Sequence, residues 1–489
     1  MPNWFKNLPN QLRLLDLSHN QIQGTIPKFS TPNNTGFVLY LSSNKLTGSL
    51  PDFPSNTVFL DISNNSISGT IPNGIGEMLP RLMFLGLSKN QLTGSIPKSL
   101  CRITLLAYLD LSKNHLSGYI PQCWNEILFL QVLDLTSNSL SGPLPSSICH
   151  ASGLRSLRLG NNTFEGVLPS NLQYCTSLSI LDLGENRLSG TLPGWIGESI
   201  STLKILRFRS NKFSGDLPPN ICHLKELHIL DVAENNLSGS IPRCFYNFSA
   251  MDSKQSDGLG EFSTGNLYLS ELSQVIKGRE LEYIKILPFL LNIDLSSNSF
   301  VNQIPEELTS LSNLLGLNLS NNHLTGNIPK EIGKMRSLES LDLSRNQLSG
   351  TISSSIALIS PLSHLNLSYN QLTGPIPIGN QLQTLNDPSI YEGNHDLCGV
   401  PLITKCTRDE PLRHPSRNDD EGEFSKTWFY IGMASGVAVG FWVVFGVLVF
   451  KNSWRHAYFR GVNDVIDRVC VAVSASMIFM KKCFKCNAD

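Results

Sequence analysis

One motif recurs through most of this chain of 489 residues, and it restricts the possible folds more than any other feature. The stretch LDLSHNQIQGTIP at 15–27 returns as LDLSKNHLSGYIP at 109–121, as LDLGENRLSGTLP at 181–193 and as LNLSNNHLTGNIP at 317–329. The repeated asparagine occupies fourteen positions, most of them 24 or 25 residues apart: Asn20, Asn44, Asn65, Asn90, Asn114, Asn138, Asn162, Asn186, Asn211, Asn235, Asn298, Asn322, Asn346 and Asn370. A fixed period of this length predicts a stack of equivalent structural units.

Each part of the motif has a physical role. In the Leu-x-Leu segment the two leucines face inward on a short strand, while the residue between them faces solvent. The asparagine amide can bond loop backbone groups, which contributes about 1 kcal/mol net and avoids a cost of roughly 1–3 kcal/mol for leaving such groups unpaired. Glycine then permits an unusual backbone conformation, and the proline after isoleucine cannot donate to a ladder. One unit cannot bury its own apolar face, so the units stack into a curved α/β repeat solenoid with a parallel sheet on its concave face.

The unit LxxLxLxxNxLxGxIP resembles the plant extracellular leucine-rich repeat, which implies a horseshoe-shaped solenoid. About fourteen units cover roughly three quarters of the chain. Two repeats depart from the pattern, because Asn302 stands at the glycine position and Ser353 at the proline position. We expect these two repeats to lack the usual turn geometry.

The repeat is interrupted once, where the step from Asn235 to Asn298 is 63 residues long. The surplus contains DSKQSDGLGEFSTGN, which is too polar and glycine-rich to continue the stack. It resembles the island domain of plant receptor-like proteins and receptor kinases, which implies a role in binding ligand or co-receptor; a disordered spacer is the alternative. The predicted organisation is leucine-rich repeats at 1–244 and 288–378, an island insertion at 245–287, a C-terminal cap at 379–408, an acidic juxtamembrane segment at 409–427, a transmembrane helix at 428–450 and a short cytoplasmic tail at 451–489.

Cysteine positions relative to the repeat predict disulfides. In two pairs the first cysteine lies 11 residues after a repeat asparagine and the second lies 9 residues after the next one. A third pair lies in a segment that resembles the C-terminal cap of the family, while Cys149 and Cys175 are in a different phase and are left open. Each of the first two bridges would contribute roughly 3 kcal/mol, and buried unpaired thiols are the alternative. The predicted pairs are Cys101–Cys123, Cys222–Cys244 and Cys398–Cys406.

Asn-x-Ser/Thr sequons occur seven times, all before residue 400. Each alone is a weak signal in a repeat that is rich in Asn and Ser, but together with the cysteine pairs they favour a secreted ectodomain. The predicted glycosylation sites are Asn33, Asn64, Asn161, Asn236, Asn247, Asn318 and Asn366.

The segment 428–450 has 23 residues without a charge, enough to cross about 30 Å of hydrocarbon. We therefore expect a single-pass type I protein of the plasma membrane, with its ectodomain outside and its C-terminus in the cytoplasm. Gly432, Gly436 and Gly440 recur every four residues, which favours close pairing with another membrane helix; the alternative is that glycine is simply common in such helices.

The 39 residues after Phe450 are too few for a kinase domain, and the kinase motifs are absent from the sequence. The tail SWRHAYF resembles that of the fungal-xylanase-receptor branch of plant receptor-like proteins. This resemblance implies three partners: an extracellular protein or peptide ligand, an adaptor receptor-like kinase and a co-receptor kinase. Because the chain begins inside a repeat without the paired-cysteine cap of the family, we expect an N-terminally truncated copy of a longer receptor.

A mixed-charge patch is the candidate ligand site. The solvent-facing strand position is Asp in most repeats, but Arg158 and Arg207 replace it. Solvated side chains without a role are the alternative. The candidate ligand contacts are Arg155, Arg158, Asp182, Lys204, Arg207, Arg209 and His228.

Composition and motifs argue against several other classes. The net charge of −1 gives no bulk attraction to nucleic acid. No catalytic set or cofactor motif occurs, and Cys483-x-x-Cys486 lacks the second pair that a zinc site needs, so we expect no enzyme, cofactor or metal. Four interpretations remain open: a defence receptor, a developmental receptor for a peptide hormone, a soluble wall-protein inhibitor, for which the segment 428–450 would be superfluous, and a non-functional truncated copy.

Overall fold

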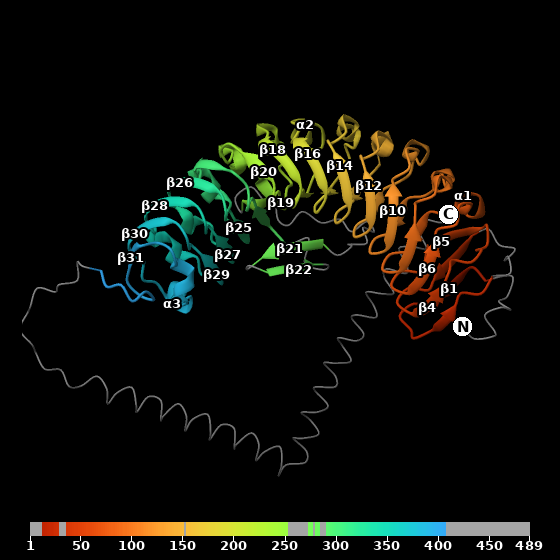
Figure 1. Cartoon of the computed structure of the whole chain (residues 1–489), viewed down its shortest axis with the longest axis horizontal. Coiled ribbons are helices and arrows are strands. Elements are labelled where there is room, and N and C mark those ends of the chain that lie inside the picture. The colour runs from red at the N-terminus through yellow and green to blue at the C-terminus, as the bar shows by residue number, and fades with distance from the viewer. Residues whose placement is uncertain are drawn as a thin grey trace, which may run out of the picture. The chain divides into compact units, whose positions relative to one another are not determined.

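The computed structural model of the protein describes residues 12–28, 36–150, 153–252, 272–276, 279–283 and 290–406 (Figure 1). The chain divides into two compact units, Met1–Arg408 and Asp409–Asp489. The second unit lies outside the described residues, and so do the predicted span, its three glycines, the tail and the sequon at Asn33. No helix within the described ranges is both long enough and apolar enough to cross a membrane.

The first unit is a solenoid with a 14-stranded parallel sheet along the inner side of its arc, as the repeat predicts (Figure 1). Each strand is offset from the next by one repeat, so that Leu109 lies opposite Leu133 and both pack in the main core. This concave sheet consists of β1 (Leu14–Asp16), β3 (Phe37–Tyr40), β5 (Thr57–Asp61), β7 (Phe84–Gly86), β9 (Tyr108–Asp110), β11 (Val132–Asp134), β13 (Ser156–Arg158), β15 (Ile180–Asp182), β17 (Ile205–Arg207), β19 (Ile229–Asp231), β23 (Asn292–Asp294), β25 (Gly316–Asn318), β27 (Ser340–Asp342) and β29 (His364–Asn366).

A second parallel strand follows each repeat asparagine. These strands were not predicted in the sequence analysis. They form a sheet of ten strands before the insertion and one of five after it. The glycine of each unit has a positive φ, for example +81° at Gly118. The ten strands are β2 (Gln23–Thr25), β4 (Lys45–Gly48), β6 (Ser66–Thr70), β8 (Gln91–Gly94), β10 (His115–Tyr119), β12 (Ser139–Gly142), β14 (Thr163–Gly166), β16 (Arg187–Thr191), β18 (Lys212–Asp216) and β20 (Asn236–Ser238); the five are β24 (Val301–Gln303), β26 (His323–Asn327), β28 (Gln347–Thr351), β30 (Gln371–Pro375) and β31 (Asp396–Cys398).

Short helical turns form the outer side of the arc (Figure 1). Several begin directly after a proline in an extended conformation, such as Pro169 with φ −66° and ψ 133°. The turns are α1 (Ile75–Met78), η2 (Lys98–Arg102), η3 (Trp124–Glu126), η4 (Ser146–His150), η5 (Ser170–Tyr174), α2 (Trp195–Ser199), η6 (Pro219–His223), η7 (Arg243–Asn247), η8 (Ser249–Met251), η10 (Glu306–Ser310), η11 (Ile332–Lys334) and η12 (Ser354–Leu358); α3 (Asn380–Thr384) and η13 (Pro388–Tyr391) follow in the cap.

The repeat asparagines bond loop backbone groups, which confirms the role predicted for them. The buried Asn90 is typical: its Nδ2 donates to the carbonyls of Ile62 and Leu87 at 3.0 and 3.1 Å, and its Oδ1 accepts from the amide of Ile67 at 2.9 Å. From Asn44 onwards, each of these side chains therefore links two neighbouring repeats, whereas Asn20 bonds only within its own repeat. The residue before each asparagine, such as Lys89 with φ 53°, adopts the left-handed conformation, which is unfavourable for non-glycine residues.

The two irregular repeats keep the usual geometry, so the expectation of altered turns was wrong. Asn302 has φ 66°, in the left-handed range that asparagine tolerates better than most residues, and its Nδ2 donates to Ser240 Oγ at 2.8 Å. Ser353 has φ −61° and ψ 130°, close to the −63° and 133° of Pro305. Its hydroxyl accepts from the amide of Ser355 and so caps the helical turn that follows.

The insertion leaves the concave sheet unbroken, because β19 pairs directly with β23. Phe245, Phe248 and Met251 are buried in the main core, so residues 245–252 belong to the solenoid rather than to the predicted island. The described residues resume at Leu290, and Leu291 packs in the main core. Between these points the structure describes one antiparallel hairpin, formed by β21 (Leu272–Ile276) and β22 (Arg279–Tyr283).

The cap at 379–406 continues the repeat in reduced form. β31 pairs with β30, and Asn394 donates to the carbonyl of Leu367 at 3.0 Å as the repeat asparagines do. Asn394 lies 24 residues after Asn370, so the period itself marks it, although the sequence analysis ended the series at Asn370. The structure contains the three expected disulfides and a fourth that was left open: Cys101–Cys123, Cys222–Cys244, Cys398–Cys406 and Cys149–Cys175.

Candidate functional site

Two columns of side chains run along the concave sheet, because alternate strand residues point away from the core. The outer column contains the first residue of each repeat's strand register, and the central column contains the residue two positions later. The outer column is Leu14, Val38, Phe59, Phe84, Tyr108, Val132, Ser156, Ile180, Ile205, Ile229, Asn292, Gly316, Ser340 and His364. The central column is Asp16, Tyr40, Asp61, Gly86, Asp110, Asp134, Arg158, Asp182, Arg207, Asp231, Asp294, Asn318, Asp342 and Asn366.

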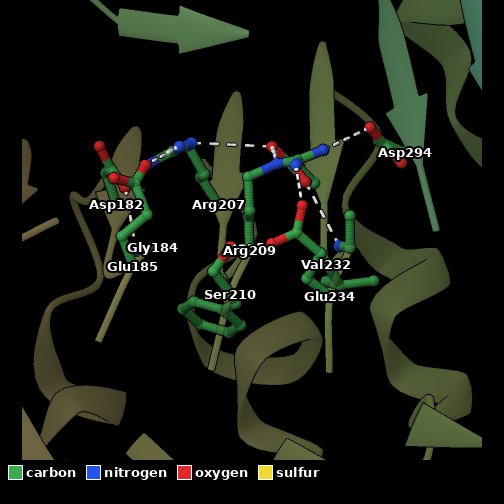
Figure 2. Close-up of polar contacts among 12 residues, drawn as sticks. Asp182, Gly184, Glu185, Arg207, Arg209, Ser210, Val232, Glu234 and Asp294 are labelled. Carbon is green, nitrogen blue, oxygen red and sulfur yellow. Dashed lines mark hydrogen bonds and ion pairs between the residues drawn. The ribbon is translucent and has the colours of Figure 1, made fainter. Parts of the chain in front are cut away.

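Arg207 is at the centre of an ion-pair network in the middle of this face (Figure 2). Its Nη1 lies 3.3 Å from Asp182 Oδ1 and its Nη2 lies 2.5 Å from Glu185 Oε1. On the other side its Nε lies 3.6 Å from Asp231 Oδ2. Gly184 makes room for the guanidinium, because a Cβ there would come 2.5 Å from Arg207 Nη1.

Arg209 extends the network towards the insertion point (Figure 2). Its Nε lies 3.0 Å from Asp231 Oδ2, its Nη1 lies 2.7 Å from Glu234 Oε1 and its Nη2 lies 2.6 Å from Asp294 Oδ2. Because Asp294 follows the insertion, this arginine joins the two blocks of repeats. Five carboxylates surround two guanidiniums: Asp182, Glu185, Asp231, Glu234 and Asp294.

Burial and charge shift the pKa values of this network. Burial lowers the pKa of Arg207, but the carboxylates of Asp182, Asp231 and Glu185 outweigh that effect and hold it above its ordinary value. Burial raises the pKa of Asp294 to about 6, with a further increase from the neighbouring Asp231 and a decrease from Arg209. Both arginines therefore remain charged, whereas Asp294 can take up a proton in mildly acidic solution.

Only part of the predicted ligand patch is accessible. Arg155 is exposed and Lys204 is half-buried, and both flank the outer column. The remaining five candidates are buried, and four of them form ion pairs; Arg158 pairs with Asp134 at 2.9 Å. The buried five are Arg158, Asp182, Arg207, Arg209 and His228.

A stack of partly exposed rings on the first repeats, here called the aromatic ladder, was missed by the sequence analysis. Phe59 and Phe84 stack with centroids 3.9 Å apart, Phe84 and Tyr108 stack at 4.3 Å, and Tyr40 tilts against Phe59 at 4.6 Å. Gly86 allows this packing, because a Cβ there would come 3.0 Å from the Phe84 ring. The 24- to 25-residue spacing of Phe59, Phe84 and Tyr108 is a signal that could have identified the ladder.

The six sequons within the described residues fall into two groups. Asn64, Asn161 and Asn236 are exposed, and Asn247 is half-buried. Asn318 and Asn366 lie in the central column, where their Nδ2 atoms donate to Asp294 and Asp342 at 3.3 and 3.4 Å.

Comparison with curated proteins identifies two plant relatives. The chain is 49% identical over 251 residues to receptor-like protein EIX2 of Solanum lycopersicum, covering 47% of this chain and 24% of the relative. It is 50% identical over 240 residues to receptor-like protein EIX1 of the same species, covering 45% of this chain and 23% of the relative. The chain thus spans about a quarter of the length of these relatives.

Solved plant ectodomains have a similar fold. The plant peptide hormone receptor RGFR1, solved in complex with RGF2, matches with a TM-score of 0.61 and 29% identity over 79% of this chain and 60% of that one. The ectodomain of the Arabidopsis receptor kinase HAESA, solved with an N-terminally extended IDA peptide hormone, matches with a TM-score of 0.63 and 32% identity over 81% of this chain and 64% of that one.

The family itself is matched over most of the solenoid. One family model, described as leucine rich repeat, matches residues 288–348 as one block. A second model with the same description matches single repeats at 11–31, 37–57, 56–78, 81–103, 105–126, 129–151, 153–175, 177–199, 202–224, 226–248 and 361–386. With its repeated asparagines and its parallel concave sheet, the chain belongs to the leucine-rich repeat family and is similar to plant receptor-like proteins.

Proposed function

We propose that this protein is a cell-surface receptor-like protein that binds an extracellular protein or peptide on the concave face of its solenoid. The observation that carries the proposal is the continuous concave sheet of 14 strands, which displays columns of side chains across all repeats. The similar receptors RGFR1 and HAESA were solved with peptide hormones bound, which supports a ligand of this class. The similarity to two receptor-like proteins supports a receptor of this class.

The membrane arrangement is part of this proposal. Residues 428–450 would form one spanning helix, with the repeats outside and residues 451–489 in the cytoplasm. Gly432, Gly436 and Gly440 would let that helix pack closely against the helix of an adaptor receptor-like kinase, and a co-receptor kinase would join when ligand binds. Replacing the three glycines by leucine should weaken co-precipitation with the kinase partner, whereas undiminished pairing would contradict this role.

We propose Arg155 and Lys204 as the ligand contacts among the seven candidates. Arg155 is exposed and Lys204 is half-buried, so both can meet a ligand without disturbing the ion-pair network. The buried members would act indirectly, by holding the concave face in one conformation.

The test is binding of a labelled extracellular elicitor preparation, fractionated to one active protein or peptide, to the chain in plant membranes. We expect Arg155→Glu with Lys204→Glu to weaken binding at least tenfold, while Arg187→Glu, at an exposed position in the second set of strands, leaves it unchanged. Equal loss in both variants, or no loss in the first, would contradict the assignment.

Two biological roles fit this activity. The resemblance of the tail SWRHAYF to the fungal-xylanase-receptor branch of plant receptor-like proteins leads us to propose a role in plant defence. The solved peptide-hormone receptors favour a developmental role as the second candidate. A response of plant cells to microbial extract supports the first role, and altered organ growth on deletion of the gene supports the second.

A further inference from the structure

A glycine interrupts the central column of side chains in the first repeats. Gly86 on β7 lies directly between Asp61 on β5 and Asp110 on β9 in the strand register. The two aspartates are two strand spacings apart, which is roughly 10 Å. The φ of Gly86 is not positive, so the backbone does not require glycine at this position. What the glycine leaves here is a place without a side chain between two carboxylates.

The same arrangement recurs in the middle of the column with an arginine in place of the glycine. Arg207 lies between Asp182 and Asp231 in the strand register. Its guanidinium approaches the two carboxylates to 3.3 Å and 3.6 Å. Two aspartates at this spacing therefore hold one guanidinium between them. At Gly86 the column has the two carboxylates but not the arginine.

Serines make the polar contacts of these two aspartates within the described part of the chain. Both aspartates are half-buried. Asp61 Oδ1 accepts from the amide of Ser63 at 3.0 Å. Asp110 Oδ1 accepts from the amide and the hydroxyl of Ser112 at 3.0 and 2.6 Å. These bonds leave the charge of each carboxylate without an opposite charge.

The pKa of Asp110 reflects this missing cation. Burial and the neighbouring Asp134 raise it to about 6, and the effects that lower it are hydrogen bonds from serine. Lys89 and Lys113 of the same repeats lie three positions beyond the column and are not among these effects. By contrast, Asp134 has Arg158 at 2.9 Å. A cation from outside the column would therefore offset a charge that the column itself does not balance.

The aromatic ladder runs along the outer column beside these carboxylates. Phe84 is on the same strand as Gly86 and is partly exposed. A Cβ at Gly86 would come 3.0 Å from both the Phe84 ring and Asp61 Oδ1. A ring and a carboxylate thus converge on the place where the side chain is missing. A guanidinium suits such surroundings, because it forms ion pairs with carboxylates and also packs against aromatic rings.

The row of carboxylates without an arginine extends over the first five strands of the concave sheet. Asp16, Asp61 and Asp110 lie on β1, β5 and β9, with Tyr40 and Gly86 on the strands between them. Negative charge is therefore presented at every second strand, roughly 10 Å apart. A polyproline II segment advances about 9 Å in three residues and returns to the same face, so basic residues three positions apart match this spacing.

We propose that the concave face of β1 to β9 binds a basic extended segment of the ligand, with an arginine side chain over Gly86 between Asp61 and Asp110. The ligand guanidinium takes the place that Arg207 holds in the middle of the column. The next basic residue, three positions along the segment, reaches Asp61 and Asp16. This inference rests on the function proposed above, and it names the ligand chemistry that one end of the concave face selects.

Fluorescence anisotropy with the purified full chain tests this assignment. The probe is a fluorescein-labelled synthetic peptide, Pro-Arg-Pro-Pro-Arg-Pro, and the control peptide carries uncharged citrulline in place of both arginines. Asp61→Asn with Asp110→Asn should weaken binding of the arginine peptide at least tenfold. This variant should keep its fold, because Asn318 and Asn366 occupy the same column and accept the same hydrogen bonds from serine.

A matched control removes two negative charges away from the concave face. Glu165→Gln with Asp216→Asn alters exposed positions on β14 and β18 and should leave the affinity for the arginine peptide unchanged. Equal loss of affinity in the two double variants would show attraction by bulk charge and would overturn the proposal. Equal binding of the arginine and citrulline peptides by the unmodified chain would overturn it as well.

A further variant fills the place from within the chain. Gly86→Arg puts an intrinsic guanidinium between Asp61 and Asp110, once the Phe84 ring has moved by a few tenths of an ångström. Binding of the arginine peptide should fall at least tenfold, while the circular dichroism spectrum stays unchanged. Undiminished binding in the folded variant would refute the site; if this variant does not fold, the asparagine variant decides.

The labelled elicitor fraction separates this inference from the proposed function. If the unmodified chain and Asp61→Asn with Asp110→Asn bind the fraction equally well, the arginine site is wrong and the receptor function stands. If the unmodified chain does not bind the fraction but binds the arginine peptide as expected, the arginine site stands and the receptor function fails.

Discussion

Single residues on the concave face differ in role even where their chemistry is the same. Arg155 and Arg207 were equal candidates in the sequence, since both are arginines on the same surface. Burial separates them, because Arg207 is 3% exposed and lies among three carboxylates while Arg155 is exposed. The sequence showed which charges come together, because the repeat period places Asp182, Arg207 and Asp231 in adjacent strands. It did not show their burial, which depends on what covers the sheet.

Replacing Arg207 should affect stability rather than ligand contact. Arg207→Met leaves Asp182 buried without its cation and Asp231 with Arg209 as its remaining partner, which should cost roughly 3–5 kcal/mol. Arg155→Met removes an exposed charge and should change the unfolding free energy by about 0.5 kcal/mol or less. Urea denaturation followed by circular dichroism measures both values. Equal stability of the two variants would contradict the structural role of the network.

Protonation of Asp294 should make the solenoid more stable as the pH falls towards 4. Burial raises its pKa to about 6 from 3.8, so the folded state binds more protons than the unfolded state between these values. This contribution is fully present below about pH 4 and is lost as the pH rises through about 6, by roughly 3 kcal/mol at most. Thermal unfolding between pH 4 and 7 should show a smaller pH dependence in Asp294→Asn than in the unchanged chain. An identical slope in the two proteins would contradict the assignment.

Elements of the solenoid were predictable to different degrees. The concave strands followed from Leu-x-Leu, since inward leucines at period two specify a strand and the repeat specifies its neighbours. The second sheets were not foreseen, because segments such as Ser66–Thr70 are polar and contain glycine, which is typical of turns; they become strands only by pairing with the next repeat. The predicted start of the insertion, at 245, lies within the solenoid, because Phe245, Phe248 and Met251 lie beyond the last motif position but still fill the core.

The disulfide between Cys149 in η4 and Cys175, which directly follows η5, should stabilise the repeats on either side of it. Cys149 and Cys175 close a loop with a sequence separation of 26, so replacing both by serine should cost roughly 3 kcal/mol in the chain-entropy model. Because repeats contact mainly their neighbours, we expect faster hydrogen exchange in β13 and β15 and little change in β27 and β29. A uniform change across all strands would contradict this local effect.

At the scale of the whole molecule, the exposure of each sequon predicts whether it carries a glycan. We expect glycans at the exposed Asn64, Asn161 and Asn236, measured by peptide mass spectrometry after enzymatic deglycosylation in ¹⁸O water. Asn318 and Asn366 should be largely unmodified, because both are half-buried in the central column, where their Nδ2 atoms face the carboxylates of Asp294 and Asp342. Full occupancy at these two sites would place sugars on the concave face and argue against ligand binding there.

The direct pairing of β19 with β23 has a consequence for how such a chain can vary. Because the two blocks of repeats are already joined across the sheet, whatever is spliced between Asp252 and Leu290 does not have to carry the mechanical continuity of the stack. Insertions of different length and sequence can therefore occupy this junction while the repeats on either side keep their register.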